Sequence, residues 1–192
     1  MTSFPLYGDR IALRPMHKRE RYLFYRWATR SDATPWWYGS VYHDEVPSYE
    51  AFKMDWADYY FDERYPLKGQ CFVIMLGSEK IGQINYNAIH PEDLSAELDI
   101  IIAWNTHQNK GYGTDAIRTL TRYLFEHLHL RRCRIEVINL NIRAIRAYEK
   151  SGYRHTYTYE RQGLIWHVME VLAGYPAGAH ETEHTTPHLS HP

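Results

Sequence analysis

The sequence predicts one α/β domain of the α+β type, with its elements in the order βααβββαβαββ. Apolar residues alternate in several short segments, as in strands, and recur at helical spacing in the segments between them. A third observation is the unit at 97–125, which has the pattern of a strand, a glycine loop and a helix. A chain of 192 residues suits one domain with a sizeable core. We expect this domain to span 1–173 and a disordered, His-rich tail to span 174–192.

The first half of the chain is expected to hold two helices and four strands. In chain order these are a strand at 10–14, helices at 17–29 and 48–63, and strands at 70–76, 79–88 and 95–103. Pro15 ends the first strand, and Ser48 offers a side-chain oxygen that suits the start of the second helix. Gly77 and Ser78 supply the turn of an antiparallel hairpin.

The second half is expected to hold two helices and three strands. A third helix follows the glycine loop and runs to about residue 129, and a strand at 133–139 precedes a helix at 141–151. Gly152 is well placed to end that helix in the left-handed conformation. Two strands, 153–160 and 164–172, then form a final hairpin.

The loop at 108–113 has the pattern Q-x-x-G-x-G. Its glycines let the backbone approach a ligand closely, and the unpaired N–H groups of the following helix suit an anion such as pyrophosphate. Lys110 adds a cation. The dinucleotide fingerprint G-x-G-x-x-G is not met, because Ala116 stands where its third glycine would fall. An ordinary turn between strand and helix is the structural alternative.

A second pattern, N-x-x-A-x-x-x-Y-x-x-x-G-[FY], lies at 141–153. Together with the glycine loop it resembles the two signatures of the GCN5-related N-acetyltransferase (GNAT) superfamily, and the resemblance extends over 8–171. The opening strand is similar to that of the branches that acetylate ribosomal proteins and antibiotics. The resemblance implies a mixed central sheet flanked by helices, with acetyl-coenzyme A (acetyl-CoA) as co-substrate. It also implies direct attack by an amine in a ternary complex.

The resemblance also implies which residues bind acetyl-CoA. They are Ile101, Ile102, Ala103, Gln108, Asn109, Lys110, Gly111, Tyr112, Gly113, Thr114, Asn141, Ala144 and Tyr148. In the family, a bulge in the strand before the glycine loop leaves backbone groups free for the thioester. Tyr148 matches the general acid that protonates the leaving thiolate, and a tyrosine packed in the core is the alternative. No metal is expected to take part.

Glu97 and Asp99 are the candidates for catalysis on the acceptor side. They lie two apart on one strand, so their side chains share a face. Counted back from Gly111, Asp99 falls where aminoglycoside 6′-N-acetyltransferases of the family carry a catalytic aspartate. We expect Asp99, and secondarily Glu97, to bind or deprotonate the amine. A hydrated structural carboxylate, or a base acting through water, is the alternative.

The segment 27–65 is expected to form the acceptor wall, with Trp36 and Trp37 in contact with substrate. Its carboxylates include Asp32, Asp44, Glu45, Asp55, Asp58, Asp62 and Glu63. Aromatic faces and carboxylates together suit a polycation, and Trp-Trp-x-Gly resembles a segment of the aminoglycoside enzymes. The favoured acceptor is therefore an aminoglycoside or another small polycationic amine. A peptide N-terminus, a polyamine, or a non-enzymatic acetyl-CoA-binding sensor are the alternatives.

Composition argues against several other classes of function. A formal net charge of −1 disfavours nucleic-acid binding, and no stretch approaches the ~20 apolar residues of a membrane span. Cys71 and Cys133 are isolated in expected strands, and the N-terminus lacks a signal-peptide pattern, so we expect a reduced, cytoplasmic protein. A homodimer remains open. The tail holds four spaced histidines, His180, His184, His188 and His191. They raise a metal-binding alternative that the prolines of the tail disfavour.

Overall fold

An eight-stranded sheet organises the structure, a computed structural model that describes residues 4–38 and 45–174. The strands are β1 (Leu6–Tyr7), β2 (Ala12–Pro15), β3 (Gln70–Leu76), β4 (Glu79–Tyr86), β5 (Ser95–Ile102), β6 (Arg132–Ile138), β7 (Arg154–Arg161) and β8 (Leu164–Leu172). Their order across the sheet is β1-β2-β3-β4-β5-β6-β8-β7. Neighbours are antiparallel except for the parallel pair β5 and β6, so the expected mixed sheet is confirmed.

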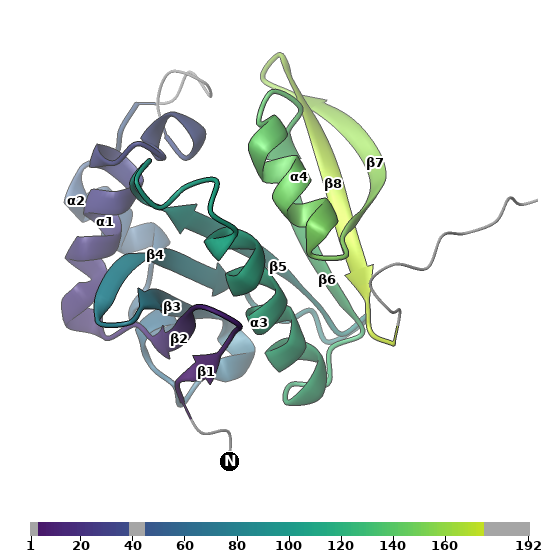
Figure 1. Cartoon of the computed structure of the whole chain (residues 1–192), viewed down its shortest axis with the longest axis horizontal. Helices are drawn as coiled ribbons and strands as arrows, with labels where there is room; N and C mark the ends of the chain where they lie inside the picture. The colour runs from purple at the N-terminus through teal and green to yellow at the C-terminus, as the bar shows by residue number, and fades with distance from the viewer. Residues whose placement is uncertain (1–3, 39–44, 175–192) are drawn as a thin grey trace, which may run out of the picture.

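Four α-helices and four short 3₁₀ helices complete the described part of the chain (Figure 1). They are η1 (Lys18–Glu20), α1 (Arg21–Arg30), η2 (Thr34–Trp36), α2 (Tyr49–Asp55), η3 (Asp58–Phe61), η4 (Pro66–Lys68), α3 (Tyr112–Glu126) and α4 (Ile142–Lys150). The four histidines of the predicted tail, together with Asp44 and Gly39, lie outside the described residues.

The alternation of side chains along the strands builds two cores, one on each face of the sheet. On β3, Phe72 and Ile74 pack with α3 and α4, whereas Cys71 and Val73 pack with α1, α2 and η3. All four side chains are fully buried. The strand predicted at 70–76 is therefore buried on both faces, which explains its continuous apolar run.

The predicted helix at 48–63 is wrong in its second half. Ser48 caps α2 as expected, accepting a hydrogen bond from the backbone N–H of Ala51 at 3.2 Å. The helix ends at Asp55, and Trp56 leaves the helical conformation with φ −103° and ψ 73°. Trp56 is buried against the ring of Phe24, with centroids 4.5 Å apart. Tertiary packing of this indole thus overrides the helical pattern of the sequence.

The parallel pairing of β5 and β6 is short. It joins Ser95–Glu97 to Arg132–Arg134 and ends there, although both strands continue. Beyond this point β5 stays paired with β4, and β6 stays paired with β8. The sheet therefore splits into two halves, with α3 and α4 beside the split (Figure 1).

One buried carboxylate ties the N-terminal turn to the start of α3. The side chain of Asp115 accepts hydrogen bonds from the backbone N–H groups of Asp9, Arg10 and Ile11 at 2.8–3.1 Å. A Cβ on Gly8 would lie 2.4 Å from Oδ1 of Asp115, so only glycine fits beside this carboxylate. This turn therefore fixes the end of α3 that carries the glycine loop.

We expect Asp115→Ala to lower the free energy of unfolding by about 1–3 kcal/mol, because backbone donors lose a charged acceptor. Urea denaturation followed by circular dichroism measures the change. Glu126→Ala, which removes an exposed carboxylate from the other end of α3, is the matched control and should change stability far less. Equal stability of the two variants would contradict the role given to Asp115.

Candidate active site

A cleft of about 930 Å³ lies at the split between β5 and β6. It is lined from β5, α3, β6, α4 and the η2 segment, and it brings together residues far apart in the sequence. The predicted site residues that line it are Trp36, Trp37, Asp99, Ile101, Ile102, Gln108, Asn109, Gly111, Tyr112, Gly113, Thr114, Asn141, Ala144 and Tyr148. Glu97, Ala103 and Lys110 do not line it.

The backbone of β5 turns polar groups toward the split at every second residue. The backbone N–H of Asn87 donates to Glu97 O, and that of Ala103 donates to Ile81 O, so odd-numbered residues of β5 bond to β4. The even-numbered residues Ile100 and Ile102 therefore direct their N–H and C=O groups toward the cleft. Ala103 has already donated its N–H and is fully buried, which keeps it out of the cleft.

The expected bulge in β5 is not present. The β4–β5 register runs without a shift from Tyr86–Leu98 to Gly82–Ile102, so divergence from β6, and not a bulge, exposes the backbone. The close approach of β4 to β5 depends on Gly82, which lies on β4. A Cβ at that position would lie 1.9 Å from the carbonyl oxygen of Ile101.

The glycine loop is held from both sides by Gln108. Its Nε2 donates to the carbonyl oxygen of Ile102 at 2.8 Å, and its Oε1 accepts from Nη1 of Arg143 on α4. Gly111 caps α3 with φ +84°, a conformation that favours glycine. At Gly113, an added Cβ would make only ordinary contacts, 3.7 Å from Ile102, so the space beside this backbone is open. The first N–H groups of α3 therefore face a space into which an anion fits.

Three predicted residues lie on α4 or at its start. Asn141 caps the helix, with Oδ1 accepting from the backbone N–H of Ala144 at 3.2 Å, which leaves Nδ2 for another partner. Ala144 is half-buried, and its small side chain keeps the wall of the cleft open. Tyr148 is 8% exposed and packs in the core on the α3 face while still lining the cleft.

Asp99 and Glu97 share the face of β5 that looks toward α1 and η2. Burial raises the pKa of Asp99, hydrogen bonds from Asn85 and Asn87 lower it, and the charge of Glu136 raises it. Burial, with the charges of Asp99 and Glu136, raises the pKa of Glu97 to about 7. Both carboxylates are thus easier to protonate than exposed ones, as a general base near neutral pH requires. Only Asp99 of this pair reaches the cleft.

Trp36 and Trp37 do line the cleft, but three of the carboxylates expected around them lie elsewhere. The indole of Trp37 is anchored on Phe24, 6.0 Å between ring centroids. Asp58 forms ion pairs with Lys18 and Arg21, Asp62 pairs with Arg64, and Asp32 accepts from the backbone N–H of Asn105. None of these three carboxylates lines the cleft. These three carboxylates of the predicted acidic wall therefore hold the surrounding structure together.

Glu136 on β6 is an acidic lining residue that the sequence analysis missed. It accepts hydrogen bonds from Arg134 and, at 2.5 Å, from Tyr159 Oη. Its side chain lies on the same sheet face as Glu97, because Glu97 pairs with Arg134 two residues earlier. Strand alternation could have identified it only if the β5–β6 pairing had been known.

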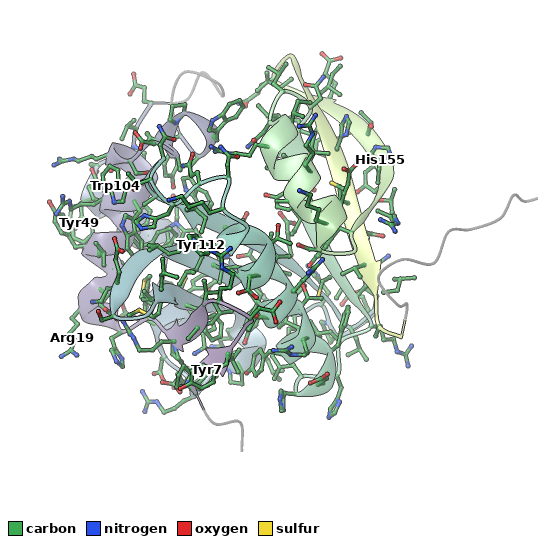
Figure 2. The ribbon with its side chains drawn as sticks, in the orientation of Figure 1. Tyr7, Arg19, Tyr49, Trp104, Tyr112 and His155 are labelled. Atoms are coloured by element: carbon green, nitrogen blue, oxygen red, sulfur yellow. The ribbon has the colours of Figure 1, made fainter. Side chains whose placement is uncertain are left out.

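Basic residues at the cleft were also missed. They are Arg10, Arg118, Arg143, Arg146, Lys150 and Arg161. Most come from α3 and α4, whose N-termini both reach the cleft. Arginine and helix N-termini together suit a phosphorylated ligand. Tyr112, labelled near the centre of Figure 2, starts α3 and carries the guanidinium of Arg10 over its ring, 4.5 Å from the centroid.

The two cysteines are not placed for chemistry. Cys71 and Cys133 are fully buried free thiols, and burial raises the pKa of each. Since the thiolate is the nucleophilic form, neither thiol suits an acyl-enzyme step. Among the described residues, no group of three or more His, Cys, Asp or Glu could hold a metal ion. No helix in that part of the chain has the length and apolarity needed to cross a membrane.

Comparison with known proteins agrees with this geometry. A family model described as "Acetyltransferase (GNAT) domain" matches residues 10–154. Aminoglycoside N(6')-acetyltransferase type 1 of Klebsiella pneumoniae is 27% identical over 169 residues, covering 82% of this chain and 78% of that protein. The protein of the same name from Serratia marcescens matches equally well.

Solved structures share the fold. Aminoglycoside acetyltransferase AAC(6')-Ib in complex with coenzyme A and kanamycin has a TM-score of 0.69 at 21% identity, covering 85% of this chain and 95% of that one. Spermidine N-acetyltransferase from Vibrio cholerae in complex with CoA and spermine has a TM-score of 0.67 at 19% identity, covering 86% and 96%.

We expect Gly113→Ala to weaken coenzyme A binding at least about tenfold, because the methyl group fits the protein but occupies the space beside the α3 N–H groups. Isothermal titration calorimetry measures the affinity. Thermal unfolding is the control, and the melting temperature should not fall, since alanine favours a helix more than glycine does. An unchanged affinity would show that the ligand does not approach this backbone.

Proposed function

Because the chain belongs to the acetyltransferase (GNAT) family, and is therefore an acetyl-CoA-dependent N-acetyltransferase, we propose that its acceptor is a small polycationic amine, most readily an aminoglycoside. One observation carries the proposal. The carboxylate of Asp99 and the phenol of Tyr148 reach the same cleft from opposite faces of the split sheet. In that arrangement Asp99 is the group that accepts a proton from the amine, and Tyr148, on the other face, is the group that donates one to the thiolate.

The residues on the α3 and α4 side fit acetyl-CoA, which supplies an acetyl group activated as a thioester. The N–H groups of Gly113 and Thr114 at the start of α3 would hold the pyrophosphate, assisted by Arg118 and Arg143. The N–H and C=O groups of Ile100 and the N–H group of Ile102 would pair with the extended pantetheine, in the place of a neighbouring strand.

Proton transfer is divided between two residues in this proposal. Amines of pKa about 10 are protonated at pH 7, so the acceptor must lose a proton before its nitrogen attacks the carbonyl carbon. Asp99, with a pKa raised by burial, receives that proton directly or through water. The hydroxyl of Tyr148 donates a proton to the sulfur as the carbon–sulfur bond breaks. With both thiols buried, transfer is direct from thioester to amine.

The acceptor side of the cleft suits a molecule with several ammonium groups. Asp99 and Glu136 both line it, and Glu97, which does not line it, is close enough to repel both carboxylates. Burial raises the pKa of Glu97 most, repulsion from Asp99 and Glu136 raises it further, and a polycation would relieve that repulsion. Trp36 and Trp37 add aromatic faces that attract cations. The names of the two curated relatives support an aminoglycoside over other amines.

Acceptor choice is tested by measuring thiol release from acetyl-CoA with purified protein and a panel of aminoglycosides, polyamines and N-terminal peptides. We expect kcat/KM to be greatest for an aminoglycoside. Asp99→Asn should lose at least about 100-fold in kcat while coenzyme affinity stays the same. If the protein acetylates only polyamines, or only peptides, the aminoglycoside proposal is wrong and that class of amine is the acceptor.

We expect Tyr148→Phe to lower kcat by roughly 10²–10⁴-fold where proton transfer limits the rate, because the ring remains but its proton donor is lost. Steady-state kinetics with a matched calorimetric measurement of coenzyme affinity checks this. Tyr123→Phe, a buried tyrosine on α3 that does not line the cleft, is the control. Wild-type kcat across the pH range in Tyr148→Phe would remove Tyr148 from the mechanism.

A further inference from the structure

Two amide side chains converge on the carboxylate of Asp99. Asn85 lies opposite Asp99 in the β4–β5 register, and Asn87 follows two residues later on the same face. Nδ2 of Asn85 donates to Oδ2 of Asp99 at 3.1 Å, and Nδ2 of Asn87 donates to the same oxygen at 3.3 Å. As far as the described residues show, Oδ1 is left for a partner in the cleft that Asp99 lines.

Different interactions determine the orientation of the two amides. Oδ1 of Asn87 accepts from Oη of Tyr60 at 3.2 Å and from Nδ2 of Asn85 at 3.2 Å. With that oxygen occupied by donors, Asn87 presents its Nδ2 to Asp99. Nδ2 of Asn85 donates to Oδ2 of Asp99 and to Oδ1 of Asn87, although Oδ1 of Asn85 is buried without a partner among the described residues. A flipped amide would set an oxygen against the carboxylate, so this orientation follows from the charge of Asp99.

We propose that Asn85 and Asn87 are positioning residues that aim the Asp99 carboxylate at the acceptor amine and keep it ionised, with Tyr60 holding Asn87 in place. The inference rests on the proposed function, in which Asp99 meets the amine. Burial raises the pKa of Asp99, and the two amide hydrogen bonds oppose that rise. Without them the pKa of Asp99 would rise further, and a protonated carboxyl group could neither pair with an ammonium group nor accept its proton.

Other titratable groups surround the carboxylate, and their titrations must be distinguished from that of Asp99. They are Cys71 on β3, Tyr60 on η3, Tyr38 after η2, Glu136 on β6 and Glu97 on β5. Burial raises the pKa of the thiol and of both phenols, so these three stay neutral around pH 7. The pKa of Glu97, about 7, falls in the working range, and its signal must be distinguished from that of Asp99.

Carbon-13 NMR titration of side-chain carboxyl groups in the full chain measures the pKa of Asp99 directly. The signals of Asp99 and Glu97 are identified by their loss in Asp99→Asn and Glu97→Gln. We expect Asn87→Ala and Asn85→Leu each to raise the pKa of Asp99 by about one pH unit, and Tyr60→Phe to raise it less. Gln83→Leu is the matched control, because Gln83 is equally buried on the same face of β4 but lies opposite Ile101.

A kinetic measurement tests the consequence for turnover. In Asn87→Ala, the acidic limb of the kcat/KM profile for the acceptor should move to higher pH by the same amount, while KM for acetyl-CoA stays constant. An unmoved NMR pKa in Asn87→Ala and Tyr60→Phe would overturn the inference, as would an equal shift in Gln83→Leu.

The two measurements also separate the inference from the proposed function. The NMR titration needs no acceptor, so it gives a result even if the aminoglycoside proposal fails. A shifted NMR pKa with an unmoved acidic limb would keep the amide contacts but remove their role in turnover. If Asn85→Leu does not fold, Tyr60→Phe still decides, because it removes only a hydroxyl group.

Discussion

The early end of the β5–β6 ladder is the constraint on which the rest of the site depends. Past Glu97 and Arg134, each strand stays bonded to its own half of the sheet, and the two inner edges separate. Backbone N–H and C=O groups on these edges need partners. The chain supplies one of them, since Gln108 donates to the carbonyl oxygen of Ile102. The remaining groups face the cleft, where an extended ligand can complete the ladder.

Hydrogen bonds between side chains connect the elements on the two sides of the split. Gln108 connects the end of β5 to Arg143 on α4, which sets the glycine loop against the neighbouring helix. Deeper in the molecule, Oγ1 of Thr121 on α3 and Oη of Tyr153 lie 2.9 Å apart in a buried hydrogen bond. The first contact brings the N-termini of α3 and α4 to the same end of the cleft, where both helix dipoles favour an anion, and the second joins α3 to the segment after α4.

Charge is distributed unequally across the split. The face that carries α3 and α4 presents several basic residues and helix N-termini, and the face toward η2 presents Asp99, Glu136 and the two tryptophans, with Arg161 near Glu136. A phosphorylated donor and a cationic acceptor are therefore attracted to opposite sides of one opening. The amide contacts of Asp99 lie on the face toward η2, where they oppose the rise in its pKa that burial causes.

The sequence alone determined the local elements and the part of the site made by consecutive residues. The strands predicted at 70–76, 79–88 and 133–139 lie within two residues of their observed bounds, because alternation and turn residues act locally. The residue pattern predicted the glycine loop, and the resemblance of 141–153 to a family signature pointed to Tyr148. Tertiary structure decided where the helix after Ser48 ends, because burial of Trp56 outweighs helix propensity. It also decided that Glu136 lines the same cleft as Asp99, and that Asp32 and Asp58 bind partners far away in sequence instead of lining the cleft. Such choices depend on which strands pair and where that pairing stops, and neither is encoded in the spacing of residues along one segment.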